Sequence, residues 1–405
     1  MKVLLVGSGG REHALAWKLA QSPLLTALHA APGNPGIAAL GLCHPVRADD
    51  PEALLDLAST LGIDLAVIGP EVPLVAGVGD ELRRGGVAVF GPSAGAAAIE
   101  GSKAFAKDVM RAAGVPTAST RAIAKPPCVV KANGLAAGKG VVICRTQAEL
   151  DRGLAEVSAI GGGLVIEELL EGPEVSLLAL CDGRTAVPLA AARDYKRAYD
   201  GDEGPNTGGM GTFAPVDGFD DAKVEELLAV VHRPVLAELA SRGTPFIGCL
   251  FAGVMLTDDG PKVLEYNCRF GDPETQSLVP LVDGDLLDAL AAAAAGELTG
   301  VSIGSRGAAV TVVLAAGDYP ASGDVGSRID GIAQAEAAGA LVFHAGTALR
   351  GGQLVTNGGR ILNVTATGAD LPAARETAYA AADLISWPGV RFRRDIAAVP
   401  SRPSR

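Results

Sequence analysis

Short apolar runs and helix-like segments alternate from residue 1 to about residue 101, and this alternation constrains the fold more than any other feature. Residues 3–6, 65–68 and 87–90 are apolar runs with the length of buried strands. A helix is predicted over residues 11–21, and a second begins after Asp50, with Pro51 at its first position. Alternating strands and helices build a parallel, doubly wound sheet. The chain is therefore predicted to be an α/β protein with a Rossmann-like N-terminal sheet.

Two further sections follow, so three domains are predicted: residues 1–101, 102–299 and 300–405, the last small and β-rich. Strands at 174–181 and 185–191 are expected to pair across an Asp182-Gly183 turn. The other predicted strands are 128–132, 141–144, 164–168, 246–257, 262–267, 308–315, 341–343 and 360–365. Later helices are predicted over 102–113, 147–160, 221–240, 289–295 and 372–385. Asn357-Gly358 is expected to be a hairpin turn, and residues 401–405 to be disordered.

Composition excludes several classes of protein. The net charge is -12, from 34 basic and 46 acidic residues, so nucleic acid is not the expected partner. Since no apolar run reaches the roughly 18–20 residues of a membrane helix, no membrane segment is expected. The six cysteines form no Cys-x-x-Cys motif, and the five histidines have no metal-ligand spacing. We expect a cytoplasmic monomer with reduced thiols.

The run from Leu264 to Gln276 carries a candidate metal site. Glu265 and Asn267 are two residues apart in a predicted strand, so both side chains point to one face. A carboxylate and an amide oxygen suit a hard cation, most simply Mg²⁺ that also binds water and nucleotide phosphates. Arg269 can bind a phosphate or carboxylate, and Asp272-Pro273 belongs to a sharp turn. A solvated strand end explains the Glu-x-Asn pair alone equally well, but not the whole run.

Two loops of the N-terminal sheet are candidate anion or substrate sites. The glycines at positions 7, 9 and 10 precede the first helix, where backbone N–H groups can bind phosphate. Glu12 stands where the dinucleotide fingerprint needs glycine, and the second strand lacks a terminal acidic residue, so NAD is not expected. Glu71 follows another strand of the same sheet and should lie near this loop. A tight turn and an exposed Gly-Pro turn are the alternatives.

Two glycine-rich stretches of the middle section can approach a ligand closely. The run from Lys131 to Gly140 joins two strands and departs from a Walker A loop, because Gly140 replaces the Ser or Thr that binds Mg²⁺. Such a loop can fold over phosphates as a lid; a mobile hairpin loop is the alternative. The second stretch begins with Asp194, Lys196 and Arg197 and continues through the glycines at 204–211. It is either a ligand-binding segment or a flexible surface loop.

These motifs and their order resemble the glycinamide ribonucleotide synthetase family, ATP-grasp enzymes of purine biosynthesis, from residue 1 to about 396. The resemblance implies an ATP-grasp domain of α+β character at 102–299, with a lid subdomain at about 120–190. The family pattern has Asp at the position of Asn133 and His at the position of Tyr195, so these two side chains are given no role. The segment at 119–127 is also shorter than in the family pattern.

The resemblance implies ATP-dependent ligation of glycine to 5-phosphoribosylamine through glycyl phosphate, with Mg²⁺ or Mn²⁺ bound at Glu265 and Asn267. Implied catalytic residues are Arg269, Lys131 and Asp194. Implied nucleotide-binding residues are Lys103, Lys131, Gly134, Gly138, Lys139, Gly140, Glu167, Glu168, Leu170 and Glu174. Implied substrate-binding residues are Gly9, Gly10, Arg11, Glu12, Glu71, Lys196, Arg197, Asn206, Thr207, Gly208, Gly209, Met210, Gly211, Asp272, Pro273 and Glu274.

Two alternatives remain open. One is an ATP-grasp carboxylate–amine ligase with another acceptor, against which the Gly7 loop, Glu71 and the 206–211 stretch argue together. The other is a dinucleotide-dependent oxidoreductase or a non-catalytic nucleotide sensor. Glu12 argues against the oxidoreductase, and the Glu265, Asn267 and Arg269 set argues against a sensor.

Overall fold

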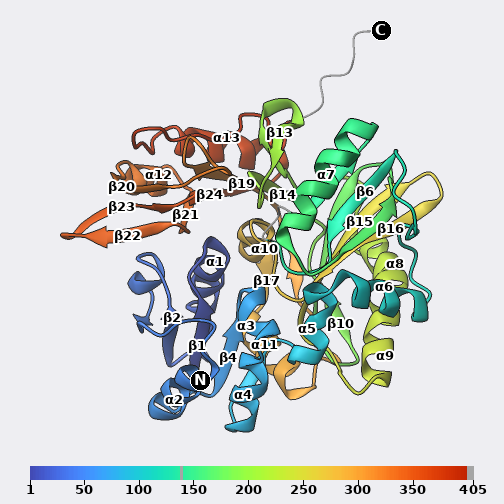
Figure 1. The fold of residues 1–405 in the computed structure, drawn as a ribbon. Coiled ribbons are helices and arrows are strands. Elements are labelled where there is room, and N and C mark those ends of the chain that lie inside the picture. Colours follow the sequence, from blue (N-terminus) through green and yellow to red (C-terminus); the bar gives the residue numbers. More distant parts are fainter. Residues whose placement is uncertain (137–139, 399–405) are drawn as a thin grey trace.

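The computed structural model describes residues 1–136 and 140–398 (Figure 1). The predictions for Gly138, Lys139 and the segment 401–405 fall outside these residues. The described chain forms several sheets, among them a parallel sheet at the N-terminus and antiparallel sheets in the other sections. This arrangement confirms the predicted fold class.

The N-terminal sheet has the strand order β3-β2-β1-β4-β5, and all its pairs are parallel. Its strands are β1 (Lys2–Gly7), β2 (Ala27–Pro32), β3 (Leu42–Cys43), β4 (Leu65–Ile68) and β5 (Ala88–Phe90). Its helices are α1 (Gly10–Leu19), α2 (Pro51–Leu61), α3 (Glu71–Val75), α4 (Val78–Arg84) and α5 (Ala94–Gly101). Because β1 and β4 are neighbours, the loops that follow them meet at the carboxyl edge of the sheet.

A separate antiparallel sheet has the order β7-β6-β8. Its strands are β6 (Cys128–Ala132), β7 (Val141–Cys144) and β8 (Leu164–Glu168), and α7 (Gln147–Ile160) packs on it, all at the predicted residues. Thr146 and Glu149 form a capping box that fixes the start of α7.

The sheet β10-β9-β15-β16 carries the candidate metal strand. Its strands are β9 (Glu174–Asp182), β10 (Ala186–Pro188), β15 (Ile247–Thr257) and β16 (Gly260–Asn267). The helix predicted over 221–240 is wrong as a single element: α8 (Asp221–Val231) ends before α9 (Arg233–Ser241) begins. Pro234 lacks an N–H group and lies in the first turn of α9, where a proline is tolerated.

A third large sheet has the order β11-β14-β19-β24-β21 and includes strands from both sides of residue 300. Its strands are β11 (Arg193–Asp194), β14 (Gly211–Ala214), β19 (Ala308–Ala315), β24 (Arg360–Gly368) and β21 (Leu341–His344). The helices α10 (Glu274–Leu281) and α13 (Leu371–Ala382) pack against it. The remaining elements are α6 (Lys103–Ala112), β12 (Arg197–Tyr199), β13 (Glu203–Asn206), β17 (Val282–Asp283), α11 (Leu286–Ala295), β18 (Gly304–Ser305), β20 (Asp324–Arg328), α12 (Ile332–Ala337), β22 (Thr347–Arg350) and β23 (Gln353–Gly358).

The hairpin turn predicted at Asn357-Gly358 is wrong. These residues end β23, which pairs with β22 and β20 in a small separate sheet, and the β22–β23 turn is at Gly351-Gly352. All six cysteines carry free thiols, and five of them are buried. Among the described helices, none is both long enough and apolar enough to cross a membrane.

Two histidines lie where α1 meets the end of β21. The backbone N–H of His344 donates to Nδ1 of His13 at 2.8 Å, which requires a neutral His13 ring. Burial, with a smaller effect of His344, lowers the pKa of His13 to about 3, and burial lowers the pKa of His344 to about 4. Both rings are expected to titrate near their ordinary pKa when the chain is unfolded.

Acid is therefore expected to destabilise this contact. Between pH 6.5 and about 4 the unfolded chain binds protons that the folded chain does not, so stability falls as the pH falls. Each histidine contributes a slope of up to about 1 kcal/mol per pH unit. His13→Gln, which keeps an acceptor for His344, should show a shallower loss between pH 7 and pH 5 in urea unfolding. Equal slopes for the variant and the unaltered protein would contradict this prediction.

Candidate active site

Arg269 joins the end of β16 to the N-terminal sheet. Its Nε donates to Glu71 Oε2 at 3.2 Å, and its Nη2 donates to Glu100 Oε1 at 3.0 Å. The other Glu100 oxygen accepts from the Cys268 N–H at 2.8 Å. Although burial lowers the pKa of Arg269, the two carboxylates outweigh it and raise that pKa above its usual value. A permanently charged guanidinium is thus fixed between two segments far apart in sequence.

Glu100 was missed as a site residue by sequence reasoning. Burial raises its pKa, and Glu71 raises it further, whereas Arg269 lowers it. The sequence feature that could have identified Glu100 is its position near the end of α5, three residues before Lys103.

The metal prediction is compatible with the geometry of β16. Glu265 and Asn267 lie on one strand, and Gly253 is opposite Glu265 on β15. A Cβ at Gly253 would lie 3.8 Å from Glu265 Cγ and 3.7 Å from Glu174 Oε1, which are ordinary van der Waals distances, so both carboxylates lie next to this position. Although burial raises the pKa of Glu265, Lys103 and Lys196 outweigh it and hold that pKa below its usual value.

No group of three His, Cys, Asp or Glu side chains in the described residues could hold a metal by itself. A cation here would therefore need the Asn267 oxygen, water and phosphate oxygens to complete its shell. This donor set suits Mg²⁺, which commonly keeps several waters and takes one or two protein carboxylates.

The buried carboxylate of Glu167, on β8, pairs with two lysines. Glu167 accepts from Lys131 Nζ and from Lys107 Nζ, each at 2.7 Å, one lysine on each oxygen. Lys131 also donates to the Leu264 carbonyl at 2.9 Å, which links β6 to β16. The Glu167 carboxylate is therefore occupied by lysines in this structure. Sequence reasoning missed Lys107, although it lies one helical turn after Lys103 on α6.

Asn133 fixes the start of α6. Its side-chain oxygen accepts from the Ala104 N–H at 2.9 Å, and its carbonyl accepts from the Lys103 N–H at 2.9 Å. The Tyr195 hydroxyl accepts from the Ala397 N–H at 3.0 Å, so this side chain contacts the C-terminal part of the chain.

Lys196 lies among acidic side chains at the start of the glycine-rich stretch. Its Nζ forms an ion pair with Glu174 Oε1. Burial lowers the pKa of Lys196, but Asp194 and Glu174 outweigh it and raise that pKa well above its usual value. Burial raises the pKa of Asp194 to about 7, although Lys196 lowers it. Burial likewise raises the pKa of Glu274, whose Oε1 accepts from Ser176 Oγ at 3.4 Å.

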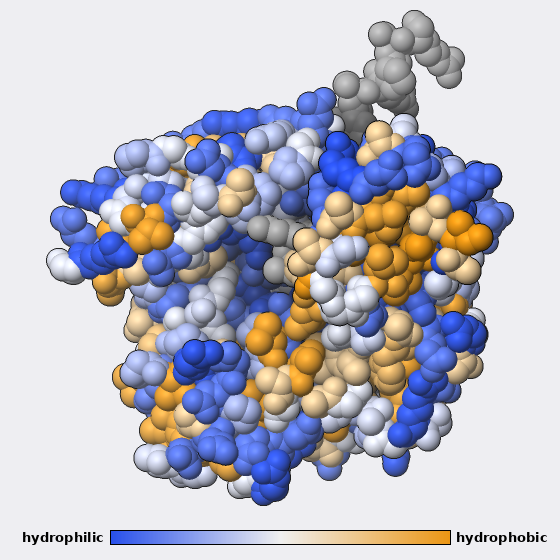
Figure 2. Space-filling model, in the orientation of Figure 1, coloured by the Kyte–Doolittle hydropathy of each residue, from blue (hydrophilic) through white to orange (hydrophobic). Residues whose placement is uncertain are grey.

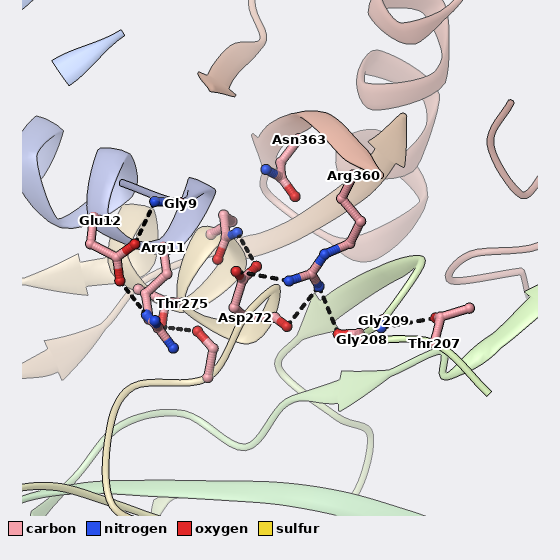
Figure 3. Close-up of polar contacts among 12 residues, drawn as sticks. Gly9, Arg11, Glu12, Thr207, Gly208, Gly209, Asp272, Thr275, Arg360 and Asn363 are labelled. Atoms are coloured by element: carbon pink, nitrogen blue, oxygen red, sulfur yellow. Dashed lines mark hydrogen bonds and ion pairs between the residues drawn. The ribbon is translucent and has the colours of Figure 1, made fainter. Parts of the chain in front are cut away.

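Asp272 lies between two arginines from opposite ends of the chain (Figure 3). Arg360 of β24 contacts its carboxylate at 2.9 Å and also donates to the carbonyls of Asp272, at 2.9 Å, and Gly208, at 2.6 Å. Burial raises the pKa of Asp272, but Arg360 and Arg11 outweigh it and lower that pKa. Sequence reasoning missed Arg360, because its partners are far away in the chain.

The loop before α1 is held by its own glutamate. Glu12 Oε2 accepts from the Gly9 N–H at 2.6 Å, and Glu12 Oε1 accepts from Arg11 Nε at 2.5 Å (Figure 3). Arg11 also donates to the Phe270 carbonyl at 3.1 Å, so this loop contacts the segment that follows β16. Figure 2 shows a hollow near the middle of the visible face, with hydrophilic residues along its left wall.

The remaining predicted site residues are placed as follows. Glu168 accepts from the Ser119 N–H at 2.8 Å, and Arg197 donates to the Gly204 carbonyl at 2.6 Å. Thr207 Oγ1 donates to the Lys196 carbonyl at 2.9 Å and accepts from the Gly209 N–H at 3.0 Å. The side chain of Met210 belongs to the interior, with 0% exposure. Gly134 and Gly140 lie on either side of residues 137–139, Leu170 lies between β8 and β9, Asn206 ends β13, Gly211 begins β14, Gly10 begins α1, and Pro273 precedes α10.

An antiparallel sheet with buried lysines, joined through Lys131 to the strand of Glu265 and Asn267, is the arrangement of an ATP-grasp protein. Three family models match the chain: phosphoribosylglycinamide synthetase N domain over 1–100, ATP-grasp (A) domain over 101–275 and C domain over 309–399. The chain therefore belongs to the phosphoribosylglycinamide synthetase family.

Relatives named phosphoribosylamine–glycine ligase support this membership. The Mesorhizobium japonicum protein is 49% identical and the match covers 98% of this chain and 97% of that one. The Streptomyces coelicolor protein is also 49% identical, with 98% and 99% coverage. A solved phosphoribosylamine–glycine ligase from Thermotoga maritima has a TM-score of 0.86 and 36% identity, with 98% and 100% coverage.

The fold alone is shared with a more distant protein. The biotin carboxylase domain of Hydrogenobacter thermophilus 2-oxoglutarate carboxylase, solved with MgADP, ADP and bicarbonate, has a TM-score of 0.71 at 20% identity. That match covers 96% of this chain and 91% of that one.

Proposed function

We propose that this chain joins glycine to 5-phosphoribosylamine with ATP, giving glycinamide ribonucleotide, ADP and phosphate in purine biosynthesis. The names of its relatives support the reaction. The observation that supports the proposed location of the reaction is the position of Arg269. This residue follows the strand of Glu265 and Asn267 and reaches Glu71 at the edge of the N-terminal sheet. The nucleotide and acceptor sides of the reaction thus meet at one side chain.

The glycine carboxylate needs activation before an amine can attack it, and we propose glycyl phosphate as the activated form. Lys103, Lys131 and Arg269 offset the charge that develops on the transferred phosphoryl group. Mg²⁺ or Mn²⁺, held by Glu265 and Asn267, supplies further neutralisation of phosphate oxygens when bound. The acceptor amine then attacks the acyl carbon, and phosphate leaves with one former carboxylate oxygen.

Other residues bind the substrates in this proposal, through side chains or through backbone groups. Gly10 and Arg11 bind the phosphate of 5-phosphoribosylamine at the start of α1, and Gly9, whose N–H donates to Glu12, shapes the loop beside it. Asp194, Lys196 and Glu71 face the acceptor side. The remaining assignments are Gly134, Gly138, Lys139, Gly140, Glu167, Glu168, Leu170 and Glu174 for ATP, and Glu12, Arg197, Asn206, Thr207, Gly208, Gly209, Met210, Gly211, Asp272, Pro273 and Glu274 for the other substrates.

Acyl phosphates hydrolyse in water, so a lid is chemically required during the reaction. We assign this role to the loop from Gly134 to Gly140, within a lid subdomain at about 120–190. The proposed domains are 1–101 for the acceptor, 102–299 for ATP and 300–405 at the C-terminus. The proposed state is a cytoplasmic monomer that acts on small molecules, without nucleic acid or membrane.

Release of ADP by purified protein tests this function. The mixture contains Mg²⁺-ATP, glycine and 5-phosphoribosylamine formed in place from ribose 5-phosphate and ammonia. ADP that forms only when all substrates are present is the expected result. ADP formed equally with another amine would assign a different acceptor, and ATP binding without ADP release would favour a nucleotide sensor.

A further inference from the structure

A short hairpin connects two parts of the proposed substrate site. This hairpin, residues 195–206, comprises β12 and β13 and follows Asp194. It contains Lys196 and leads into Thr207 and the glycines after it. Residues 202–205 are exposed, and two strands of this length are only marginally stable alone. Contacts from elsewhere in the chain must therefore set the position of the hairpin.

The last described part of the chain supplies many of these contacts. This C-terminal segment, residues 391–397, bonds to the hairpin through backbone and side-chain groups. The Ala397 N–H donates to the Tyr195 hydroxyl at 3.0 Å, and the Arg394 N–H donates to Asp200 Oδ1 at 2.7 Å. In the reverse direction, the Gly201 N–H donates to Asp395 Oδ2 at 3.0 Å.

Arg393 is the centre of this contact, and only 2% of it is exposed. Its Nη1 donates to the Arg197 carbonyl at 3.0 Å and to Asp202 Oδ1 at 3.2 Å. Its Nε and Nη2 bind the two oxygens of Asp395 at 2.7 and 2.6 Å. The guanidinium also lies 4.8 Å from the centre of the Tyr195 ring. A buried guanidinium with this many partners fixes their relative positions, since losing it would leave a carboxylate unpaired.

Arg391 extends the contact to the other wall of a cavity. It donates to the Ala198 carbonyl in the hairpin and to the carbonyls of Gly317, at 3.2 Å, and Tyr319, at 2.5 Å. The Tyr319 hydroxyl accepts from the Gly208 N–H at 3.0 Å. Residues 206–208 and 319–323 line a cavity of about 310 Å³. The C-terminal segment thus contacts both the hairpin that leads into one wall of this cavity and Tyr319 in the other wall.

We propose that the C-terminal segment is a positioning element of the active site and that Arg393 is its central positioning residue. It holds the hairpin so that Lys196 and the stretch beginning at Thr207 are preorganised for the substrates. The inference rests on the proposed function, because it assigns a task to the proposed substrate-binding residues. Neither Arg393 nor Arg391 is given contact with substrate or with the reacting atoms.

Arg393→Met tests the proposal, because methionine keeps an apolar stem but removes the guanidinium. Arg394→Met is the matched control: the Arg394 side chain pairs with Asp383 on the surface and is 57% exposed. For Arg393→Met we expect kcat/KM for glycine and for 5-phosphoribosylamine to fall at least about tenfold, while the Kd of ATP changes less than about twofold. The control should stay within about twofold of the unaltered protein on every measure.

Two further measurements separate positioning from general damage. Arg393→Lys keeps the charge without the fork and should recover part of the loss in kcat/KM. Tyr195→Phe removes only the hydroxyl that accepts from Ala397 and should shift kcat/KM in the same direction, by a few fold. If Arg393→Met does not fold, the kcat/KM of Tyr195→Phe decides whether the segment has the positioning role.

The outcomes distinguish this inference from the proposed function. An unaltered protein that releases no ADP with all substrates would refute the proposed function itself. An active protein in which Arg393→Met matches Arg394→Met, or loses ATP affinity as strongly as kcat/KM, would overturn the positioning role. If only Tyr195→Phe can be measured, unchanged kcat/KM overturns it.

Discussion

Glu265→Ala is expected to lower the rate of ADP formation more than about 10³-fold at saturating Mg²⁺ while leaving the fold intact. The loss follows from geometry, because the Glu265 carboxylate and the Asn267 amide lie on one strand and no larger acidic cluster is available in the described residues to replace them. Stability should change little, because Glu265 is in no ion pair among the described residues and its side chain is partly exposed on an edge strand.

The matched control for this variant is Asp259→Ala. Asp259 belongs to the turn of the same β15–β16 hairpin, but its side chain is 87% exposed. Rates are measured across a Mg²⁺ titration, together with thermal unfolding of each protein. A control that loses activity in parallel would point to damage of the hairpin. Full activity in Glu265→Ala would contradict the metal assignment.

Arg269→Met is expected to damage both activity and stability. The substitution removes the cation that neutralises phosphate charge, which should slow turnover by about 10³-fold. It also strips Glu71 and Glu100 of a shared partner at 3.2 and 3.0 Å. An uncompensated buried carboxylate costs about 3 kcal/mol of unfolding free energy.

A second substitution isolates the electrostatic part of that loss. Arg269→Met combined with Glu100→Gln should recover part of the unfolding free energy, because one of the stranded charges is gone, but should recover no activity. Arg233→Met, which removes an exposed arginine paired with Glu225, serves as control and should leave both quantities nearly unchanged. An Arg269→Met variant as stable as this control would show that the two carboxylates do not depend on Arg269.

Local sequence patterns predicted the elements whose structure depends on residues close by in the chain. The strands β1, β4 and β6 and the helix α7 lie where apolar periodicity and capping residues predict them. The placement of Glu265 and Asn267 on one face could also be predicted, because side chains two residues apart in a strand point to the same side.

Long-range pairing could not be predicted in the same way. The short strands β11 and β14 join a sheet with strands of the C-terminal section, and nothing in residues 193–194 indicates that partner. Arg360 reaches Asp272 from 88 residues away, and Lys107 of α6 reaches Glu167 of β8. Such contacts depend on tertiary packing, so no local period reveals them. The prediction of one helix over 221–240 overlooked Pro234, which is a local signal that a new helix begins there.

Transfer of an oxygen isotope tests the central claim most directly. The claim is that this site activates the carboxylate of glycine by phosphorylation before the amine attacks. Glycine labelled with oxygen-18 in both carboxylate positions is turned over with ATP and 5-phosphoribosylamine, and the inorganic phosphate is analysed by mass spectrometry. One labelled oxygen in each phosphate, with the other kept in the amide product, is the predicted result. Unlabelled phosphate formed alongside the amide would contradict the account.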